Sequence, residues 1–200
     1  MTGTIHLTMP LTAWAGLTDT AGEVAGYGPA DAATCRALAA LMTPASTTRW
    51  QLSLLTPAGQ PLATTTAPAS HPPPTGPAAL RWAAALRPTL TWLQATGCRH
   101  HRAEDSYQPS RRLRNLITFR QPECAFPGCR RPATRGDLDH TQPHDQGGRT
   151  CECNLAPLCR QHHRAKQAPR WHLTQDQPGA LTWQLPSGRR YTARPHSYPV

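Results

Sequence analysis

The sequence predicts an α+β fold: a small ββα unit held together by cysteine and histidine side chains, a short C-terminal β-meander, and a mostly helical, partly disordered N-terminal region. Two observations carry this prediction. Only 27 of the 200 residues are Leu, Ile, Val or Phe, and 22 are proline, which leaves too little apolar material for one large core. Five of the seven cysteines lie between positions 124 and 159, and five of the ten histidines lie in or beside that stretch.

The positive charge of the chain lies mainly in its second half. The formal net charge is +10; residues 1–98 carry four arginines and three acidic residues, whereas residues 99–200 carry sixteen arginines, one lysine and eight acidic residues. Guanidinium groups bind phosphate through a rigid fork of donors. A basic half of this kind predicts a polyanionic partner, with nucleic acid as the first candidate.

The cysteine usage and the hydropathy indicate a cytoplasmic protein. No apolar run approaches the ~18 residues of a membrane span, and the first twenty residues lack the pattern of a signal peptide. Seven cysteines is an odd number, and their clustering in a chain expected in the cytoplasm favours metal binding over disulfides.

Local signals predict the elements along the chain. Asp31 can cap a helix that Pro44 ends, and Pro88 interrupts a later helical stretch. The expected elements are a helix over 28–43, a strand over 49–55, a Pro-rich extended linker over 64–78, a helical stretch over 78–96, an amphipathic helix over 110–120 and a two- or three-stranded meander over 171–195.

Two short pairs of residues predict a zinc site. The first is C-x4-C with a Pro-Gly turn between the cysteines, and the second is a C-x2-H pair suited to the first turn of a helix. Two such pairs supply the tetrahedral Cys3His set that Zn²⁺ prefers. The predicted ligands are Cys124, Cys129, Cys159 and His162, with Cys151 and Cys153 as rival ligands on a loop.

The residues between these pairs, together with the histidine that follows the second pair, include the groups that a phosphodiester hydrolase needs. Such an enzyme needs a base to deprotonate water and a cation to bear charge on the phosphate. Asp139 and His140, with His163 on a following helix, supply these groups. His163 is the neighbour of His162, and adjacent residues on a helix diverge by about 100°, so the two histidines can serve different metals.

The order Asp139-His140, Asn154, His163, framed by the two pairs, resembles the HNH endonuclease family. The stretches CAFPGCRRPATRGDLDHTQP and NLAPLCRQHHRAK, followed by the Trp-containing tail, are similar to actinobacterial HNH proteins that carry an N-terminal helical domain of unknown function. The resemblance covers residues 107–195 and, more thinly, 26–66. It implies a zinc-stapled ββα-metal, treble-clef-like nuclease domain over 107–195, preceded by a remnant of the helical domain (1–63), the linker (64–78) and a helical connector (79–106).

The resemblance also implies roles for individual residues. His140 would be the general base, and Asn154 would pin the loop between the two strands. Asp139 and His163 would hold one catalytic Mg²⁺ or Mn²⁺. The pairs described above would hold a structural Zn²⁺, and double-stranded DNA would be bound by Arg160, Arg164 and Lys166.

Two points stay open at this level. In a regular strand Asp137 and Asp139 share a face that His140 does not, so the strand has to end or bulge at 139–140, or Asp137 becomes a rival ligand. The same residues also fit a non-catalytic zinc-containing module that binds nucleic acid, or a truncated, inactive nuclease remnant. Three other histidines are expected to be solvated surface groups: His100, His101 and His144.

Overall fold

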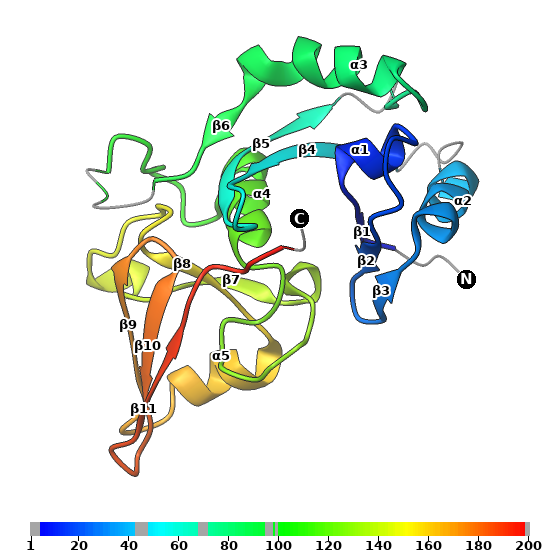
Figure 1. Ribbon diagram of the computed structural model, residues 1–200. Helices are drawn as coiled ribbons and strands as arrows, with labels where there is room; N and C mark the ends of the chain where they lie inside the picture. The colour runs from blue at the N-terminus through cyan, green and yellow to red at the C-terminus, as the bar shows by residue number, and fades with distance from the viewer. Residues whose placement is uncertain (1–4, 43–47, 68–71, 95–97, 99, 199–200) are drawn as a thin grey trace. The chain divides into compact units, whose positions relative to one another are not determined.

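The computed structural model describes residues 5–42, 48–67, 72–94, 98 and 100–198. The chain divides into two compact units, the first formed by Met1–Thr91 with Tyr198–Val200 and the second by Trp92–Ser197 (Figure 1). Among the described residues, no helix is long and apolar enough to cross a membrane.

The first unit contains two small sheets and three helices. Its first sheet has the order β1-β2-β3, with strands Leu7–Thr8, Gly22–Val24 and Gly28–Ala30. Its second sheet has the order β4-β5-β6, with strands Trp50–Leu55, Pro61–Ala67 and Thr91–Trp92, the last at the end of the unit. The helices are α1 (Leu11–Trp14), α2 (Ala32–Met42) and α3 (Ala78–Leu86), the last followed by the 3-10 turn η1 (Arg87–Thr89).

Two predictions for this unit are confirmed. Helix α2 lies within 28–43, and the carboxylate of Asp31 accepts a hydrogen bond from the backbone amide of Thr34 at 2.9 Å, as expected of an N-terminal cap. Strand β4 lies within 49–55. The core here is small, built on Trp14, Ala39 and Ala79, as the shortage of large aliphatic residues requires.

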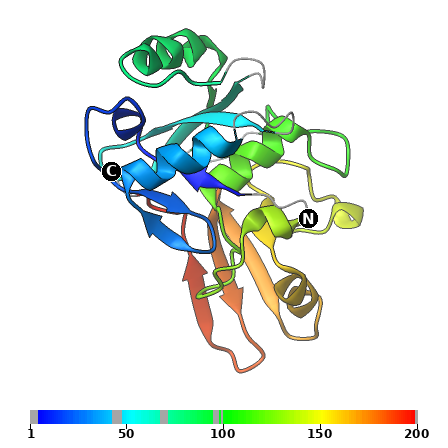
Figure 2. The same cartoon turned by 90° about the vertical axis from the view of Figure 1, so that its right-hand side faces the viewer.

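Three predictions for this unit are wrong. The helical stretch expected over 78–96 ends as an α-helix at Leu86, and the 3-10 turn η1 and the strand β6 follow it. The region is not mostly helical, because two sheets stand beside its helices (Figure 2). The extended linker expected from residue 64 is part of β5 as far as Ala67, since residues 61–67 pair with β4 in an antiparallel register and bury Ala63, Thr64 and Thr65. The next predicted linker residues, 68–71, lie outside the described residues.

The second unit contains a ββα element followed by a meander. An amphipathic helix precedes them: α4 (Arg111–Arg120), in which the hydroxyl of Ser110 accepts from the Leu113 amide. The ββα element consists of β7 (Asp137–His140), β8 (Leu155–Leu158) and α5 (Arg160–Lys166), with β7 and β8 antiparallel. The short 3-10 turns η2 (Ala133–Arg135) and η3 (His144–Gln146) flank β7. The meander has the order β11-β10-β9 and consists of β9 (His172–Gln177), β10 (Ala180–Gln184) and β11 (Arg190–Ala193), which confirms the expectation for the tail.

The meander packs against the segment that begins at Cys124. Trp183 is fully buried, and its indole Nε1 donates to the backbone oxygen of Ala125 at 2.9 Å. Leu158 and Leu181 complete this core, with the ring of Phe126 5.2 Å from that of Trp183. The core of the second unit is thus continuous with the cysteines that the sequence predicts as zinc ligands.

Candidate functional site

Four predicted zinc ligands come together in the second unit. One ligand atom from each of them lies within 4.8 Å of every other, and we call this set the first cluster: Cys124, Cys129, Cys159 and His162. The Sγ atoms of Cys124 and Cys159 are each 3.4 Å from Nδ1 of His162. A tetrahedral Zn²⁺ with bonds of ~2.1–2.3 Å would separate its ligands by roughly 3.5–3.8 Å, so the first cluster can hold such an ion.

Local geometry explains why these four side chains converge. Gly128 has a φ of 78°, a left-handed conformation that favours glycine, and it turns the chain between the first two cysteines. Cys159 stands at the N-cap of α5, which puts His162 in the first turn. The ring of Phe126 stacks on that of His162 at a centroid distance of 3.9 Å and fixes the imidazole plane.

The cysteines of the first cluster differ in acidity. Burial raises the pKa of Cys124 to about 12. Burial also raises the pKa of Cys159, but hydrogen bonds from the backbone of His162 and from Cys124 outweigh it, so the pKa is lowered overall. A cysteine binds a metal ion as a thiolate. Binding of a divalent cation by these cysteines would therefore release protons.

Asp137, Asp139 and His163 meet where α5 packs on the ββ hairpin. Nδ1 of His163 lies 2.7 Å from Oδ2 of Asp137, and its Nε2 lies 3.3 Å from Oδ1 of Asp139. The register of β7 with β8 is regular through His140. The strand thus has no bulge at 139–140 and ends only after His140, so Asp137 stands on the same face as Asp139, as a rival ligand.

His140 lies on the other side of β7 and is buried. Its Nε2 is 2.9 Å from the hydroxyl of Thr150, and its ring stacks on that of Tyr107 with a centroid distance of 5.2 Å. His144 approaches it edge-on at 5.4 Å. Burial lowers the pKa of His140, His144 lowers it further, and the negative charge of Asp139 opposes both. These effects together favour the neutral form of the imidazole.

Three basic residues of α5 were predicted to contact phosphate. Lys166 differs from this expectation, because its ammonium group donates to Oδ2 of Asp139 at 2.7 Å and to the backbone oxygen of His140, and only 12% of its side chain is exposed. Arg160 is exposed and lies 3.6 Å from Asp137. Arg164 is exposed to solvent. The two arginines remain accessible to a ligand, and Lys166 is held inside the site.

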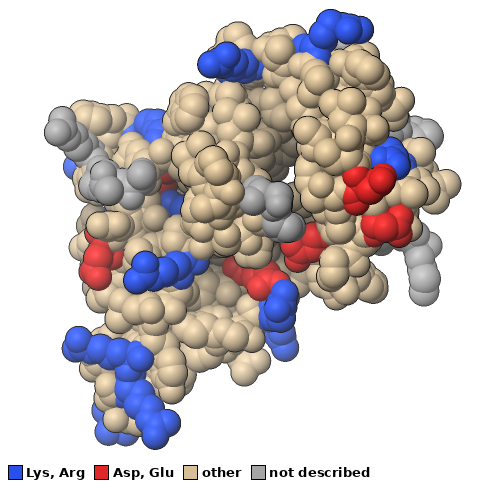
Figure 3. Space-filling view, viewed as in Figure 1, with Lys and Arg blue, Asp and Glu red and all other residues tan. Residues whose placement is uncertain are grey.

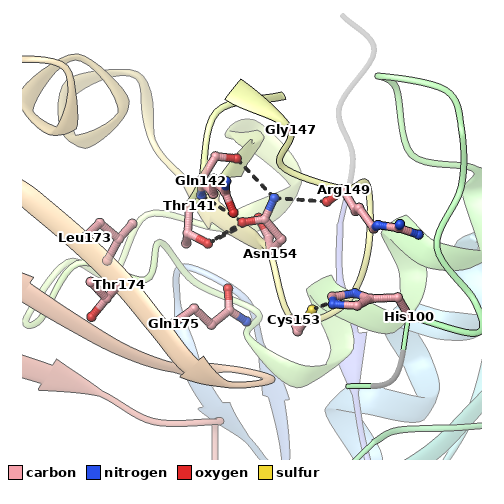
Figure 4. Close-up of a pocket in the computed structure, with 10 residues that line it drawn as sticks. All are labelled: His100, Thr141, Gln142, Gly147, Arg149, Cys153, Asn154, Leu173, Thr174 and Gln175. Atoms are coloured by element: carbon pink, nitrogen blue, oxygen red, sulfur yellow. Dashed lines mark hydrogen bonds between the residues drawn. The ribbon is translucent and has the colours of Figure 1, made fainter. Parts of the chain in front are cut away.

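Asn154 closes the loop between β7 and β8 (Figure 4). Its Oδ1 accepts from the Thr141 hydroxyl at 2.7 Å and from the Gln142 amide at 2.8 Å. Its Nδ2 donates to the backbone oxygens of Gln142 and Arg149 at 3.0 and 2.9 Å. A Cβ on Gly148 would stand 2.0 Å from the Gln142 oxygen, so the Gly-Gly turn is a steric requirement of this closure.

An open pocket of about 360 Å³ lies on the side of Asn154 that faces β9 (Figure 4). Its wall is mostly polar, with Arg149 as its cation and Thr174 and Gln175 from β9 opposite. His140, Asp139 and His163 are not among its lining residues in the part of the chain that is described. The pocket is therefore separate from these three residues, whereas Asn154, also a predicted site residue, lines it.

The second unit contains another group of potential metal ligands, which the prediction from the sequence does not include. We call it the second cluster: Cys98, His100, Cys151 and Cys153, whose ligand atoms also lie within 4.8 Å of one another. The rival cysteines of the loop belong to this set and not to the first cluster. The sequence predicts His100 as a surface group, because Cys98 and His100 lie about fifty residues before Cys151 and Cys153. The C-x-H and C-x-C spacings are the signal that could have found it.

The surface charge is uneven on the face drawn in Figure 3. A group of Lys and Arg side chains lies over the turn between β10 and β11, and acidic side chains lie elsewhere on that face. Gly188 makes this turn with a φ of 82°, and two arginines, Arg189 and Arg190, follow it. This basic tip is a second place, besides α5, where a polyanion would be attracted.

Two uncharacterized proteins of Mycobacterium tuberculosis (strain ATCC 25618 / H37Rv) are similar to this chain. The protein Rv3776 is 39% identical over 97 residues, which are 48% of this chain and 18% of that protein. The protein Rv2100 is 38% identical over 96 residues, which are 48% of this chain and 17% of that protein. The chain thus spans less than a fifth of the length of these relatives. No protein-family model matches the sequence, and no solved structure matches it significantly.

Proposed function

We propose that the second unit is a metal-dependent endonuclease domain of the HNH type that hydrolyses phosphodiester bonds of DNA. The observation that carries the proposal is the arrangement around β7. A buried histidine lies on one face of the strand, and two carboxylates with a second histidine lie on the other. A module whose only task is structural needs no such set.

His140 is the proposed general base. We assign the hydroxyl hydrogen of Thr150 to the backbone oxygen of Tyr107, 3.4 Å away, so that the hydroxyl accepts a hydrogen bond from Nε2–H of His140 at 2.9 Å. That tautomer leaves the lone pair on Nδ1 to take a proton from water. The oxygen of this water then forms a bond to phosphorus, and the bond from phosphorus to the 3′ oxygen breaks.

The donor set at Asp139 and His163 fits a hard divalent cation such as Mg²⁺ or Mn²⁺. Their nearest atoms are 3.3 Å apart, close to the roughly 3 Å between adjacent ligands in an octahedron with bonds of ~2.1 Å. Asp137 contacts the other ring nitrogen of His163, which is the usual way a carboxylate orients a metal-binding imidazole. When bound, the ion would bear charge on the scissile phosphate and on the leaving oxygen.

The substrate would approach over Tyr107 and α5. The ring of Tyr107 covers His140 and is 57% exposed, so this residue has to move aside for a phosphodiester to reach the base. Arg160 and Arg164 are exposed on α5 and would bind the flanking phosphates. Lys166 would leave Asp139 or share it with the cation.

Cleavage of supercoiled plasmid tests the proposal. The full chain, purified with zinc retained, is incubated with plasmid in Mg²⁺, in Mn²⁺ and with chelator, beside the variants His140→Ala and His101→Ala. We expect nicking by the wild type in the presence of the divalent ion, loss of at least 100-fold with His140→Ala, and wild-type rates with His101→Ala, whose side chain is exposed and belongs to neither cluster. Equal activity of His140→Ala and the wild type would refute the proposed role of His140.

A second candidate is a zinc-containing module that binds nucleic acid without cleaving it. Two observations favour it: Lys166 occupies a carboxylate oxygen of Asp139, and His140 is only 3% exposed. Salt-dependent DNA binding by the same wild-type protein, with no cleavage in either metal, would select this candidate.

A further inference from the structure

The second cluster brings together two segments that are about fifty residues apart. Cys98 and His100 precede α4, whereas Cys151 and Cys153 lie in the loop just before β8. The Sγ atoms of Cys98 and Cys151 are 3.1 Å apart, and Nδ1 of His100 is 3.5 Å from Sγ of Cys153 and 3.9 Å from Sγ of Cys98. The pair between Cys153 and His100 is drawn in Figure 4.

We propose that Cys98, His100, Cys151 and Cys153 bind a second structural zinc ion, which ties the segment before α4 to the loop that ends at Asn154. The proposal goes beyond the nuclease activity and does not depend on it. It assigns this ion to a site formed without any residue of the first cluster.

The distances of His100 and the donor types agree with zinc. The two contacts of His100 are close to the roughly 3.5 Å that separates nitrogen and sulfur on one tetrahedral zinc. The 3.1 Å between Sγ of Cys98 and Sγ of Cys151 lies between the ~2.05 Å of a disulfide and the roughly 3.8 Å between two sulfurs on one tetrahedral zinc, so a bound ion would move these two sulfurs apart. Three thiolates and one imidazole are a common structural set for Zn²⁺, and soft sulfur donors disfavour Mg²⁺ and Ca²⁺.

The backbone at His100 is consistent with a constrained position. Its φ is 55°, a left-handed conformation that is strained for a residue with a Cβ. The Ala103 amide donates to the His100 oxygen at 3.0 Å and closes a tight turn there. A turn of this kind directs the imidazole toward the cysteines although the residue is exposed.

The charged side chains around the second cluster leave a net positive charge, which a bound anion would balance. Arg120 is 2% exposed, and its Nε and Nη1 atoms have no hydrogen-bond partner among the described residues. Burial lowers the pKa of this arginine to about 10, whereas Glu152 and the three cysteines of the cluster raise it. With Arg102 paired to Glu152, one positive charge is left over. A Zn²⁺ bound by three thiolates and a neutral histidine carries one negative charge, which would balance it.

The second zinc would hold the base of the loop between β7 and β8. Cys151 accepts the amide of Asn154 on its backbone oxygen at 3.0 Å, and Thr150 accepts the amide of Glu104 in the same way at 2.9 Å. Cys151 and Cys153, two of the proposed zinc ligands, therefore lie between Thr150, which contacts His140, and Asn154, which closes the loop. The ion would restrict the motion of both residues, although it is bound by none of His140, Asp139 and His163.

Metal stoichiometry tests the proposal on the full chain. Zinc is counted by mass spectrometry of the native protein purified with zinc and reductant. We expect two ions per wild-type chain and one in the double variant Cys98→Ser/Cys153→Ser. The matched control is Cys35→Ser, a buried cysteine in the first unit outside both clusters, which should keep two ions.

Cobalt titration of the wild type covers the case in which the double variant fails to fold. Two equivalents of Co²⁺ should bind, each with a sulfur-to-metal charge-transfer band. One equivalent per wild-type chain would overturn the proposal, and so would two zinc ions retained by the double variant. A disulfide between Cys98 and Cys151, found by mass spectrometry of protein purified with zinc and alkylated without reductant, would overturn it as well.

Discussion

Replacement of Asn154 by alanine should release the loop between β7 and β8 while leaving the strands paired. The amide of Asn154 makes four hydrogen bonds, two as acceptor and two as donor, and the residue is 8% exposed. No other described side chain joins both ends of residues 141–149 in this way. The loop is therefore expected to depend on this one amide.

The magnitude follows from those bonds. Each contributes about 1 kcal/mol net, and the partners on Gln142 and Arg149 can regain water because these residues are exposed. We expect Asn154→Ala to lower the free energy of unfolding by about 3 kcal/mol, which in a unit of roughly 100 residues lowers the melting temperature by at least ~10 °C. Asn154→Asp loses both donors and puts a carboxylate oxygen at the place of Nδ2, 3.0 and 2.9 Å from two backbone oxygens, so it should destabilise the unit at least as much as Asn154→Ala.

Thermal unfolding followed by circular dichroism, with zinc in the buffer, measures this change. The matched control is Thr141→Val, which removes one of the four bonds and should cost about 1 kcal/mol. Hydrogen exchange adds a local readout. The Gln142 amide should exchange fast in Asn154→Ala, whereas the Thr141 amide, bonded to the backbone oxygen of Asn154, should stay protected. A variant that melts within 2 °C of the wild type (roughly 0.5 kcal/mol) would refute this reasoning.

Three further outcomes are expected. Gly148→Ala should destabilise the second unit by ~1–3 kcal/mol in urea unfolding, because its Cβ would stand 2.0 Å from the Gln142 oxygen; an unchanged midpoint would contradict this. Asp31→Ala should lower the melting temperature of the first unit at neutral pH. Hydrogen bonds from Thr34 lower the pKa of Asp31 below its ordinary 3.8, so the stabilisation is present above that value, and the difference between variant and wild type should shrink as the pH falls below it. Zinc removal by a strong chelator should abolish the near-ultraviolet circular dichroism of Trp183, which is bonded to the residue after Cys124; a spectrum unchanged after proven zinc loss would exclude this dependence.

Elements with local signals could be predicted from the sequence, and elements defined by distant pairing could not. The capping carboxylate of Asp31 marks α2, and the Pro-Gly turn at 178–179 marks the meander. Strand β5 has neither signal. Its sequence PLATTTA is rich in threonine and alanine and begins with proline, so it reads as a linker. Its strand character comes from β4, because strand propensity depends on the partner and on burial.

The potential metal ligands also differ in whether they follow from local spacing or from distant pairing. The first cluster joins pairs of close spacing that a turn and a helix present together, so its geometry follows from the sequence. The second cluster depends on how the segment before α4 returns to the loop before β8, which a spacing rule does not contain. The contacts of Lys166 with Asp139 and of Tyr107 with His140 were missed for the same reason, since both join different elements.

The ligand pairs of the two clusters alternate along the chain. The pair at 98 and 100 is followed by that at 124 and 129, then by that at 151 and 153, and last by that at 159 and 162. A fragment that starts at residue 107, where the resemblance begins, keeps all of the first cluster but leaves Cys151 and Cys153 without their partners. Any cut between 98 and 162 divides at least one cluster. A fragment that contains both clusters whole therefore has to start no later than Cys98. A fragment that lacks Cys98 and His100 leaves the thiols of Cys151 and Cys153 open to oxidation.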